Sequence, residues 1–212
     1  MTGRPVSPDD LTLTLDNPRA ERVKKVAALA GRSARSRAGV LLVEGPQSVR
    51  EAVRFAPERI RDLYVSADVL DRHRDIVAGA LDADRWVHVG TDAVLAAMSG
   101  DAQGILAVVE ETGVSLDEVL ALTPRLIAVL SNVRDPGNAG AAIRAADAAG
   151  ADAVILAGDC VDPSNPKVVR SSAGSVFHVP VVRSLPLRDA VVELQQAGLR
   201  VLAADGAGSV TL

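Results

Sequence analysis

Three consecutive segments in the second half of the chain combine residues that could hold an anionic or polar ligand. Residues 126–131 form an apolar run of strand length, residues 132–140 contain one proline and two glycines, and residues 141–150 are rich in alanine. This order predicts a buried strand, a tight turn and a helix, with Asn138 as the helix N-cap. The first turn of a helix leaves backbone N–H groups without partners, which suits an anion. Arg144, about one turn into this helix, is therefore a candidate ligand-contacting charge.

The two glycines of this turn, Gly137 and Gly140, do not form a specific nucleotide signature. The three-glycine dinucleotide fingerprint and the Gly-Lys-Ser/Thr ending of a phosphate loop are both missing. Taken alone, the spacing is better explained by a tight turn that simply requires glycine, and Arg144 and Asp147 could simply pair along the helix. A nucleotide-dependent enzyme of the Rossmann type is an alternative that rests on this turn alone.

Composition excludes several kinds of site. Cys160 is the only cysteine and the three histidines are far apart in sequence, which argues against disulfides and metal chemistry. No apolar run is long enough to span a bilayer, and the N-terminus lacks the apolar region of a signal peptide. We therefore expect a cytoplasmic protein with no metal and no membrane partner.

Charge is distributed unevenly along the chain. The net charge is −4, yet residues 19–61 carry eleven Lys and Arg against four Glu, so this part is +7 and the remainder is −11. A basic region on an acidic protein indicates a polyanionic partner, although solvated helix faces would give the same count. With only two Phe, one Tyr and one Trp, base stacking cannot be the main recognition device. Phosphate contact and shape would have to dominate.

The basic region begins after a predicted flexible leader, residues 1–14. A helix is expected from Asn17, as the N-cap, to residue 30. Residues 31–39 are expected to form a flexible loop between two glycines, without a carboxylate nearby in sequence. The arginines of this loop are our candidates for phosphate contact: Arg32, Arg35 and Arg37.

The rest of the chain alternates strands and helices in two series, which predicts two α/β domains. The boundaries fall at residues 15–110 for the first domain, 111–124 for a linker and 125–212 for the second domain. Strands are expected at residues 40–44, 60–65, 86–89 and 105–109, then at 126–131, 153–157, 176–182 and 199–204. Helices are expected at residues 47–55, 67–80, 92–98 and 115–122, then at 139–149, 166–173 and 187–197. Crossover helices between the later strands favour a mostly parallel sheet, whose ligands bind at the carboxyl ends of the strands.

Two longer motifs resemble a known family. Residues 132–150, NVRDPGNAGAAIRAADAAG, and residues 169–180, VRSSAGSVFHVP, closely resemble the SpoU (TrmH-like) branch of the SPOUT RNA methyltransferases. Residues 42–46, LVEGP, and residues 103–107, QGILA, look like the substrate-binding domain often fused ahead of that catalytic domain. The resemblance covers nearly the whole chain from about Asn17.

The resemblance implies an N-terminal domain similar to ribosomal protein L30e, followed by a mostly parallel α/β catalytic domain containing a trefoil knot. It implies methyl transfer from S-adenosylmethionine to a ribose 2′-hydroxyl of RNA, most often ribosomal RNA, by a homodimer. Such a transfer requires no metal. An RNA-binding module of the same fold without catalysis is the alternative function.

The resemblance also assigns roles to residues of this chain. Arg144 and Asn138 match the catalytic Arg and Asn of the first motif; because a guanidinium stays protonated, Arg144 would stabilise charge on the 2′-oxygen or hold a phosphate. The strand end at Leu202, Ala203, Ala204 and Gly206 matches the place of cofactor contact, with an ordinary strand exit as the alternative. The implied RNA-contact residues are Arg134, Arg170, Ser171 and Ser172; for the last three, with Gly174, close helix packing is an equal alternative.

Two further expectations concern His178 and the end of the sequence. His178 lies in an apolar pattern and is expected to serve packing rather than chemistry. The family carries two more motifs that complete the knot, the cofactor pocket and the dimer interface, and the sequence stops at Leu212 before either. We therefore expect the catalytic domain to be incomplete in this sequence, with weak or absent cofactor binding and no turnover if nothing follows.

Overall fold

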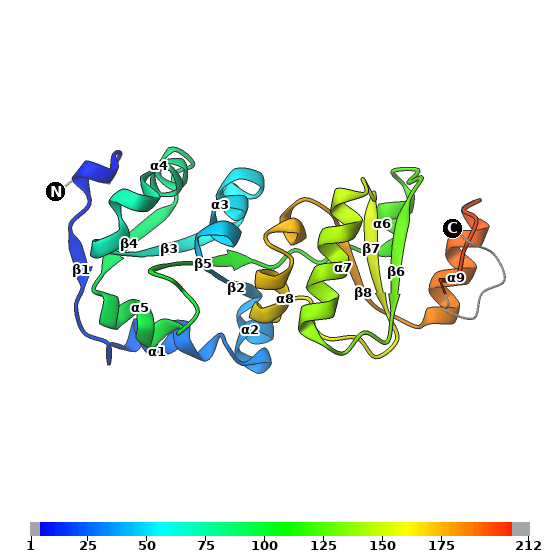
Figure 1. Ribbon diagram of the computed structural model, residues 1–212, viewed down its shortest axis with the longest axis horizontal. Helices are drawn as coiled ribbons and strands as arrows, with labels where there is room; N and C mark the ends of the chain where they lie inside the picture. The colour runs from blue at the N-terminus through cyan, green and yellow to red at the C-terminus, as the bar shows by residue number, and fades with distance from the viewer. Residues whose placement is uncertain (1–4, 205–212) are drawn as a thin grey trace.

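Two separate β-sheets organise the computed structural model, which describes residues 5–204. The sheets lie one after the other along the long axis of the molecule (Figure 1). We call the part built around β1–β5 the N-terminal unit and the part built around β6–β8 the C-terminal unit.

The N-terminal sheet has five strands in the order β1-β4-β3-β5-β2. β3 pairs parallel with β4 and antiparallel with β5, and β5 pairs antiparallel with β2. The strands are β1 (Leu13–Leu15), β2 (Val40–Glu44), β3 (Ile60–Ser66), β4 (Trp86–Gly90) and β5 (Ile105–Glu110). This pairing places the two short family-like segments side by side, because Val43 lies opposite Ala107 and the N–H of Gly45 donates to the carbonyl of Ile105 over 3.1 Å.

Helices cover both faces of the N-terminal sheet. On one face α3 (Pro46–Phe55) and α4 (Arg74–Asp82) bury residues such as Val49 and Ile76, and on the other α1 (Glu21–Ala28) and α5 (Asp92–Met98) bury Val23 and Val94. α2 (Arg32–Ala38) lies at the end next to the C-terminal unit (Figure 1). Short 3-10 helices complete the chain path: η1 (Pro8–Asp10), η2 (Pro57–Arg59), η3 (Ala67–Val69), η4 (Asp71–His73) and η5 (Ser175–Phe177).

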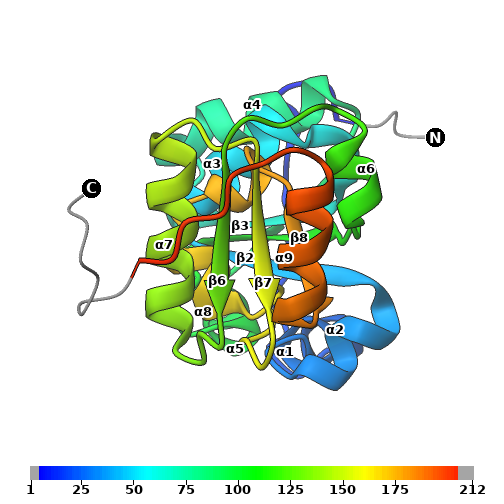
Figure 2. The same cartoon turned by 90° about the vertical axis from the view of Figure 1, so that its right-hand side faces the viewer.

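The C-terminal sheet is wholly parallel in the described residues, as the sequence predicts. Its order is β6-β7-β8, with β6 (Ile127–Ser131), β7 (Ala153–Ala157) and β8 (Val181–Leu185). Successive residues of β7 face opposite sides: Val154 and Leu156 contact α7 and α8, and Ile155 contacts α6 and α9. Figure 2 shows the sheet between α7 on one side and α9 on the other. The helices are α6 (Leu116–Leu120), α7 (Pro136–Ala148), α8 (Pro166–Ser171) and α9 (Leu187–Gln196).

The N-terminal segment differs from its predicted form. Leu13–Leu15 form a strand paired with β4, so the predicted flexible leader is wrong at its end. The first helix begins at Glu21 after Ala20, because Asn17 uses its side chain to accept from the N–H of Arg19 in a preceding turn.

Two predicted strands of the C-terminal unit are also wrong. Residues 176–182 include a 3-10 turn, Ser175–Phe177, after Gly174 at φ +99°, so β8 starts only at Val181. Residues 199–204 form no strand, although Leu199 and Val201 pack against the core. In both segments the apolar pattern indicates that the side chains are buried. A buried turn gives the same pattern as a strand.

α7 and α8 approach closely at Gly140, where no side chain fits. A Cβ on Gly140 would lie 2.6 Å from the carbonyl oxygen of Val168 and 2.7 Å from the backbone nitrogen of Ser172. We expect Gly140→Ala to lower the free energy of unfolding by about 1–3 kcal/mol, because backbone atoms cannot yield to the methyl group. Helix propensity alone would raise the free energy of unfolding by up to about 1 kcal/mol. The sign of the measured change therefore shows whether the clash or the helix propensity dominates.

Urea denaturation of Gly140→Ala and wild type measures this difference. Gly113→Ala is the control, because a Cβ there meets no atom within 4 Å. A Gly140→Ala variant as stable as wild type would show that the helices can separate without cost.

Candidate functional site

The turns after β6 and β7 meet at the carboxyl edge of the C-terminal sheet. Asn132 adopts φ +55°, and its side-chain oxygen accepts from the N–H of Asp159 over 2.9 Å. α7 then begins at Pro136, with Asp135 as its N-cap: the carboxylate accepts from the N–H of Asn138 over 2.8 Å. The prediction that Asn138 caps the helix is therefore wrong. An Asp directly before a Pro was the stronger start signal in the sequence.

Arg144 lies on the solvent-exposed side of α7, with Ile143 and Ala146 buried against the sheet. Within residues 5–204 its guanidinium makes no hydrogen bond or ion pair. The alternative pairing with Asp147 is wrong, since Asp147 lies 2.8 Å from Nδ1 of His178. Arg144 thus has no partner among residues 5–204, and it lies about two turns into α7 rather than the predicted one turn.

Asn138 and Arg144 do not come together. Both are exposed, and six residues of helix separate them by about 9 Å along the axis and by about 120° around it. Asn138 therefore cannot orient the guanidinium of Arg144 directly.

His178 links the two units rather than serving apolar packing alone. Its Nε2 lies 3.1 Å from a carboxylate oxygen of Glu51 on α3, opposite the Asp147 contact at Nδ1. Its ring also lies 4.1 Å, centroid to centroid, from the ring of Phe55. Gly174 permits this approach, because a side chain there would clash with Glu51.

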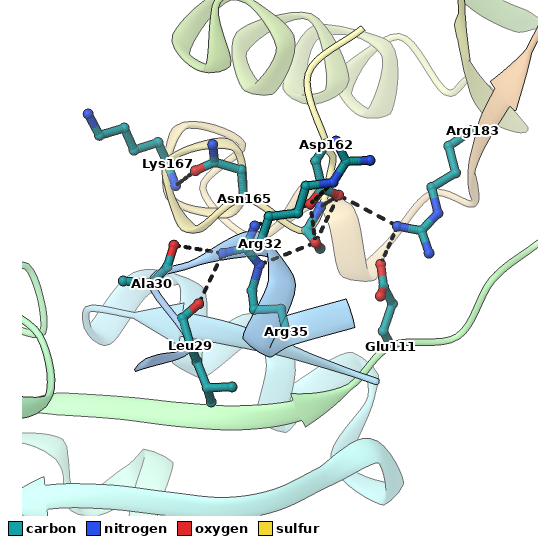
Figure 3. Close-up of polar contacts among 10 residues, drawn as sticks. Leu29, Ala30, Arg32, Arg35, Glu111, Asp162, Asn165, Lys167 and Arg183 are labelled. Atoms are coloured by element: carbon teal, nitrogen blue, oxygen red, sulfur yellow. Dashed lines mark hydrogen bonds and ion pairs between the residues drawn. The ribbon is translucent and has the colours of Figure 1, made fainter. Parts of the chain in front are cut away.

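Arg35 is the central contact between the units (Figure 3). Residues 31–39 are not a loop: Gly31 is extended, Gly39 is left-handed at φ +64°, and α2 runs between them. The Arg35 side chain is only 2% exposed. Its Nη1 donates to the carbonyls of Leu29 and Ala30 over 3.0 and 2.8 Å. The expectation that Arg35 contacts phosphate is therefore wrong.

The remaining donors of Arg35 cross to the loop after β7. Nη2 donates to Asp162 over 3.2 Å and Nε to Ser164 over 3.3 Å. Asp162 also accepts from the hydroxyl and N–H of Ser164, and Nη1 of Arg183 lies 3.5 Å away. Burial alone would raise the pKa of Asp162, but the Ser164 hydrogen bonds and the Arg35 charge outweigh it and hold this pKa below its usual range.

The other candidate RNA-contact residues divide into accessible and engaged side chains. Arg32 is 81% exposed and lies 3.7 Å from Asp162, Arg37 is exposed, and Arg134 pairs on the surface with Asp159. Arg170 is engaged with Glu44 and Asp101 of the N-terminal unit at 2.7 and 2.9 Å.

The two serines of the second motif are engaged in packing. The Ser171 hydroxyl donates to the carbonyl of Pro136 over 2.9 Å, and the buried Ser172 hydroxyl donates to that of Val169 over 2.7 Å. For Arg170, Ser171 and Ser172, the contacts favour the packing alternative.

The predicted cofactor residues end the described part of the chain. Leu202 is 60% exposed, and Ala203 and Ala204 are exposed as well. No backbone hydrogen bond within residues 5–204 involves these three residues. Gly206 lies outside the described residues.

A cavity of about 250 Å³ lies at the junction, between α2 and the carboxyl end of β7. Two residues that the sequence did not single out, Glu111 and Arg183, pair across it at 2.6 Å. Because 72 positions separate them in sequence, no local pattern indicates that they pair. The polar lining consists of Arg32, Ser36, Glu111, Asp162, Ser164 and Arg183.

Neither a metal-binding cluster nor a helix suited to crossing a membrane occurs in the described part of the chain. No three His, Cys, Asp or Glu side chains gather there in a way that could hold a metal ion. Its helices are too short or too polar to span a bilayer.

Comparison with known proteins decides the family. Residues 125–211 match the model of the SpoU rRNA Methylase family, and residues 42–113 match that of the RNA 2′-O ribose methyltransferase substrate-binding domain. The 23S rRNA (guanosine(2553)-2′-O)-methyltransferase RlmP of Bacillus subtilis is 32% identical, over 88% of this chain and 71% of its own length. The chain belongs to the SpoU rRNA methylase family.

Other relatives of this SpoU-family chain are rRNA methyltransferases as well. The 23S rRNA (guanosine-2′-O-)-methyltransferase RlmB of Bordetella pertussis is 34% identical, over 79% of this chain and 71% of its own length. An rRNA methyltransferase structure from Sinorhizobium meliloti has a TM-score of 0.77 at 27% identity, covering 92% of this chain and 74% of its own. AviRb of Streptomyces viridochromogenes, solved with S-adenosylmethionine, has a TM-score of 0.70 at 30% identity, covering 84% of this chain and 67% of its own.

The lowered pKa of Asp162 makes the junction sensitive to acid. A carboxylate with a lowered folded-state pKa stabilises the protein above its unfolded-state pKa, and the contribution is lost as pH falls through the folded-state value. We expect Asp162→Asn to lower the free energy of unfolding at pH 7 by about 1–3 kcal/mol. The difference from wild type should shrink as the pH falls below about 3.9, the unperturbed value of an aspartate, and through the lowered folded-state pKa.

Denaturant titrations at several pH values test this expectation. Asp159→Asn is the matched control, because Asp159 lies in the same loop but its pair with Arg134 is 73–76% exposed and contributes little. Equal effects of the two substitutions at pH 7 would contradict the role of Asp162.

Proposed function

We propose that this SpoU-family enzyme transfers the methyl group of S-adenosylmethionine to a ribose 2′-hydroxyl of 23S rRNA, with Arg144 at the reacting end. The observation that carries this assignment is the exposed guanidinium of Arg144 on α7, which has no partner among residues 5–204. The named relatives act on 23S rRNA ribose, and AviRb binds S-adenosylmethionine. The N-terminal unit would hold the RNA, as its match to the substrate-binding model supports.

Arg144 acts by electrostatics and position. A guanidinium stays protonated at physiological pH and so cannot accept the proton of the ribose hydroxyl. It stabilises the negative charge that develops on the 2′-oxygen, or holds the adjacent phosphate so that the hydroxyl points at the methyl group. No group among residues 5–204 binds this guanidinium, so its donors are available to the RNA. Arg134, exposed in the turn after β6, would contact a nearby phosphate in exchange for its surface pair with Asp159.

The segment Leu202–Ala204 fits contact with the methyl donor. Its exposed leucine and its backbone groups, which make no hydrogen bond within the described residues, are the apolar and polar groups that an adenosyl moiety uses. S-adenosylmethionine supplies an activated methyl group on its sulfonium. The segment would hold the adenosyl end, while Arg144 holds the RNA end.

The finer family properties are part of the same proposal. We infer a knotted catalytic domain that acts as a homodimer in the cytoplasm, where ribosomal RNA is found. These properties rest on the resemblance to the SpoU family. The aligned part of the RlmP relative is 71% of that protein's length.

Replacing Arg144 tests the proposed chemistry. We expect Arg144→Ala to slow methylation of unmodified 23S rRNA by about 100- to 1,000-fold, since one stabilising charge at the reacting oxygen is lost. S-adenosylmethionine affinity should be nearly unchanged. Isotope-labelled methyl donor, followed by nuclease digestion, reports whether the label is on ribose.

Arg188→Ala on α9 is the control, because it removes an exposed arginine from the helix on the opposite face of the sheet from α7. Label on a base would refute the ribose assignment. Strong RNA binding without methyl transfer, in a chain that also fails to bind the cofactor, would identify an RNA-binding module instead.

A further inference from the structure

A large groove lies on the N-terminal unit, between α1 and α2 and over the sheet. Its volume is about 820 Å³, compared with about 250 Å³ for the cavity at the junction. That size falls within the range of about 300–1,000 Å³ typical of sites that enclose a ligand of nucleoside size or larger. α1 and α2 lie side by side along the lower edge in both views (Figures 1 and 2).

The floor of the groove is apolar and uncharged. It is made by side chains of α1 and the sheet, among them Val26, Leu29, Val40 and Val108. Tyr64 also lines it, and burial, together with the charge of Asp62, raises the pKa of Tyr64 to about 12. The phenol therefore stays neutral at physiological pH. Only 2% of Tyr64 is exposed, so its ring is not a stacking platform.

The rim of the groove is basic. Four cations line it, Arg22, Lys25, Arg37 and Arg61, against the carboxylates of Glu21 and Asp62.

Some of these cations are engaged and others are available. Arg61 is held by Glu110 at 3.0 Å, and Nη1 of Arg22 lies 2.9 Å from the ring of His88. Lys25 is 75% exposed, with Glu21 only at 4.0 Å. Arg37 is exposed and, within residues 5–204, has only Ser33 as a hydrogen-bond partner, at 3.4 Å. Lys25 and Arg37, one from each helix, are the charges free to bind an anion.

α2 connects this groove with the junction cavity. Ala34 and Arg37 line the groove, whereas Arg32 and Ser36 line the cavity at the carboxyl end of β7. Buried Arg35 fixes the helix between them. An extended polyanion lying in the groove would therefore pass over α2, by way of exposed Arg32, toward the C-terminal unit.

We propose that the groove between α1 and α2 binds a single-stranded segment of the substrate RNA, with its phosphates at Lys25 and Arg37 and its sugars and bases against the apolar floor. This inference rests on the proposed function and assigns its RNA contact to one face of the N-terminal unit. Charge complementarity carries it, since the groove has a cationic excess on a protein whose net charge is −4. Without an exposed aromatic platform, recognition there is by phosphate and shape, with little sequence preference.

The test compares two double variants with the same change of charge. Lys25→Glu/Arg37→Glu reverses the free cations of the groove, and Lys24→Glu/Arg72→Glu reverses one exposed lysine and one exposed arginine that do not line it. RNA affinity is measured with a fluorescent fragment of unmodified 23S rRNA at several salt concentrations. Thermal unfolding checks that each variant is folded.

We expect the groove variant to bind at least 10-fold more weakly at low salt. Its plot of log affinity against log salt should be flatter by about 1.4, since two single-strand phosphate contacts are lost. The control variant should stay within about 3-fold of wild type. Unchanged affinity of a folded groove variant, or equal losses in the two variants, would overturn the proposal.

Three further outcomes complete the test, and the last two separate the groove from the proposed function. Displacement of the RNA by poly-glutamate at equal charge concentration would indicate a site for an acidic protein segment, and would also overturn the proposal. If the wild-type protein methylates ribose but the groove variant binds RNA with wild-type affinity, only the groove proposal is rejected. Failure of wild-type protein to bind or methylate RNA rejects the proposed function itself.

Discussion

The buried guanidinium of Arg35 is the constraint on which the arrangement of the two units depends. A charged group excluded from water is stable only when its donors are satisfied, and Arg35 uses carbonyls of its own unit together with Asp162 and Ser164 of the other. Its geometry thus ties α2 to the loop after β7 in one orientation. Removing either side would leave buried polar atoms unpaired, so the docked arrangement is strongly specified.

Further ion pairs along the same junction add to this constraint. Arg170 contacts Glu44, and His178 contacts Glu51, in both cases from the C-terminal to the N-terminal unit. Arginines committed to such pairs are unavailable for RNA. The exposed cations that remain accessible to an anion include Lys25, Arg32, Arg37, Arg134 and Arg144. The cations engaged between the units and the exposed cations are therefore different side chains, although the sequence intermixes them.

Local sequence signals predicted much of the fold. The strand at Val40–Glu44 and the helix at Asp92–Met98 have their predicted bounds, because each combines one apolar pattern with a clear stop or cap. The prediction of a strand at residues 176–182 is wrong, because a buried turn and a buried strand share the same apolar pattern. Segment 31–39 was mistaken for a loop because its helix is stabilised by partners outside the segment.

The site was less predictable than the fold for a related reason. The turn and helix that carry Arg144 have local signals, and the sequence predicted both, although α7 begins at Pro136 with Asp135 rather than Asn138 as its N-cap. Arg35 and Arg170 are unavailable to RNA because they bind Asp162 and Glu44, each more than 120 positions away in sequence. No periodicity in a single sequence reports pairing over such a distance.

Our central claim is that a rigid junction presents RNA held by one unit to the reacting end of the other. The most direct measurement is the single-turnover rate of ribose methylation by Arg35→Met at saturating RNA, with RNA affinity measured in parallel and folding checked by circular dichroism. We expect the methylation rate to fall at least 10-fold while RNA affinity changes less than about 3-fold, because misplacement of the reacting groups by even a small distance is costly. A folded Arg35→Met protein that methylates at the wild-type rate would contradict the account.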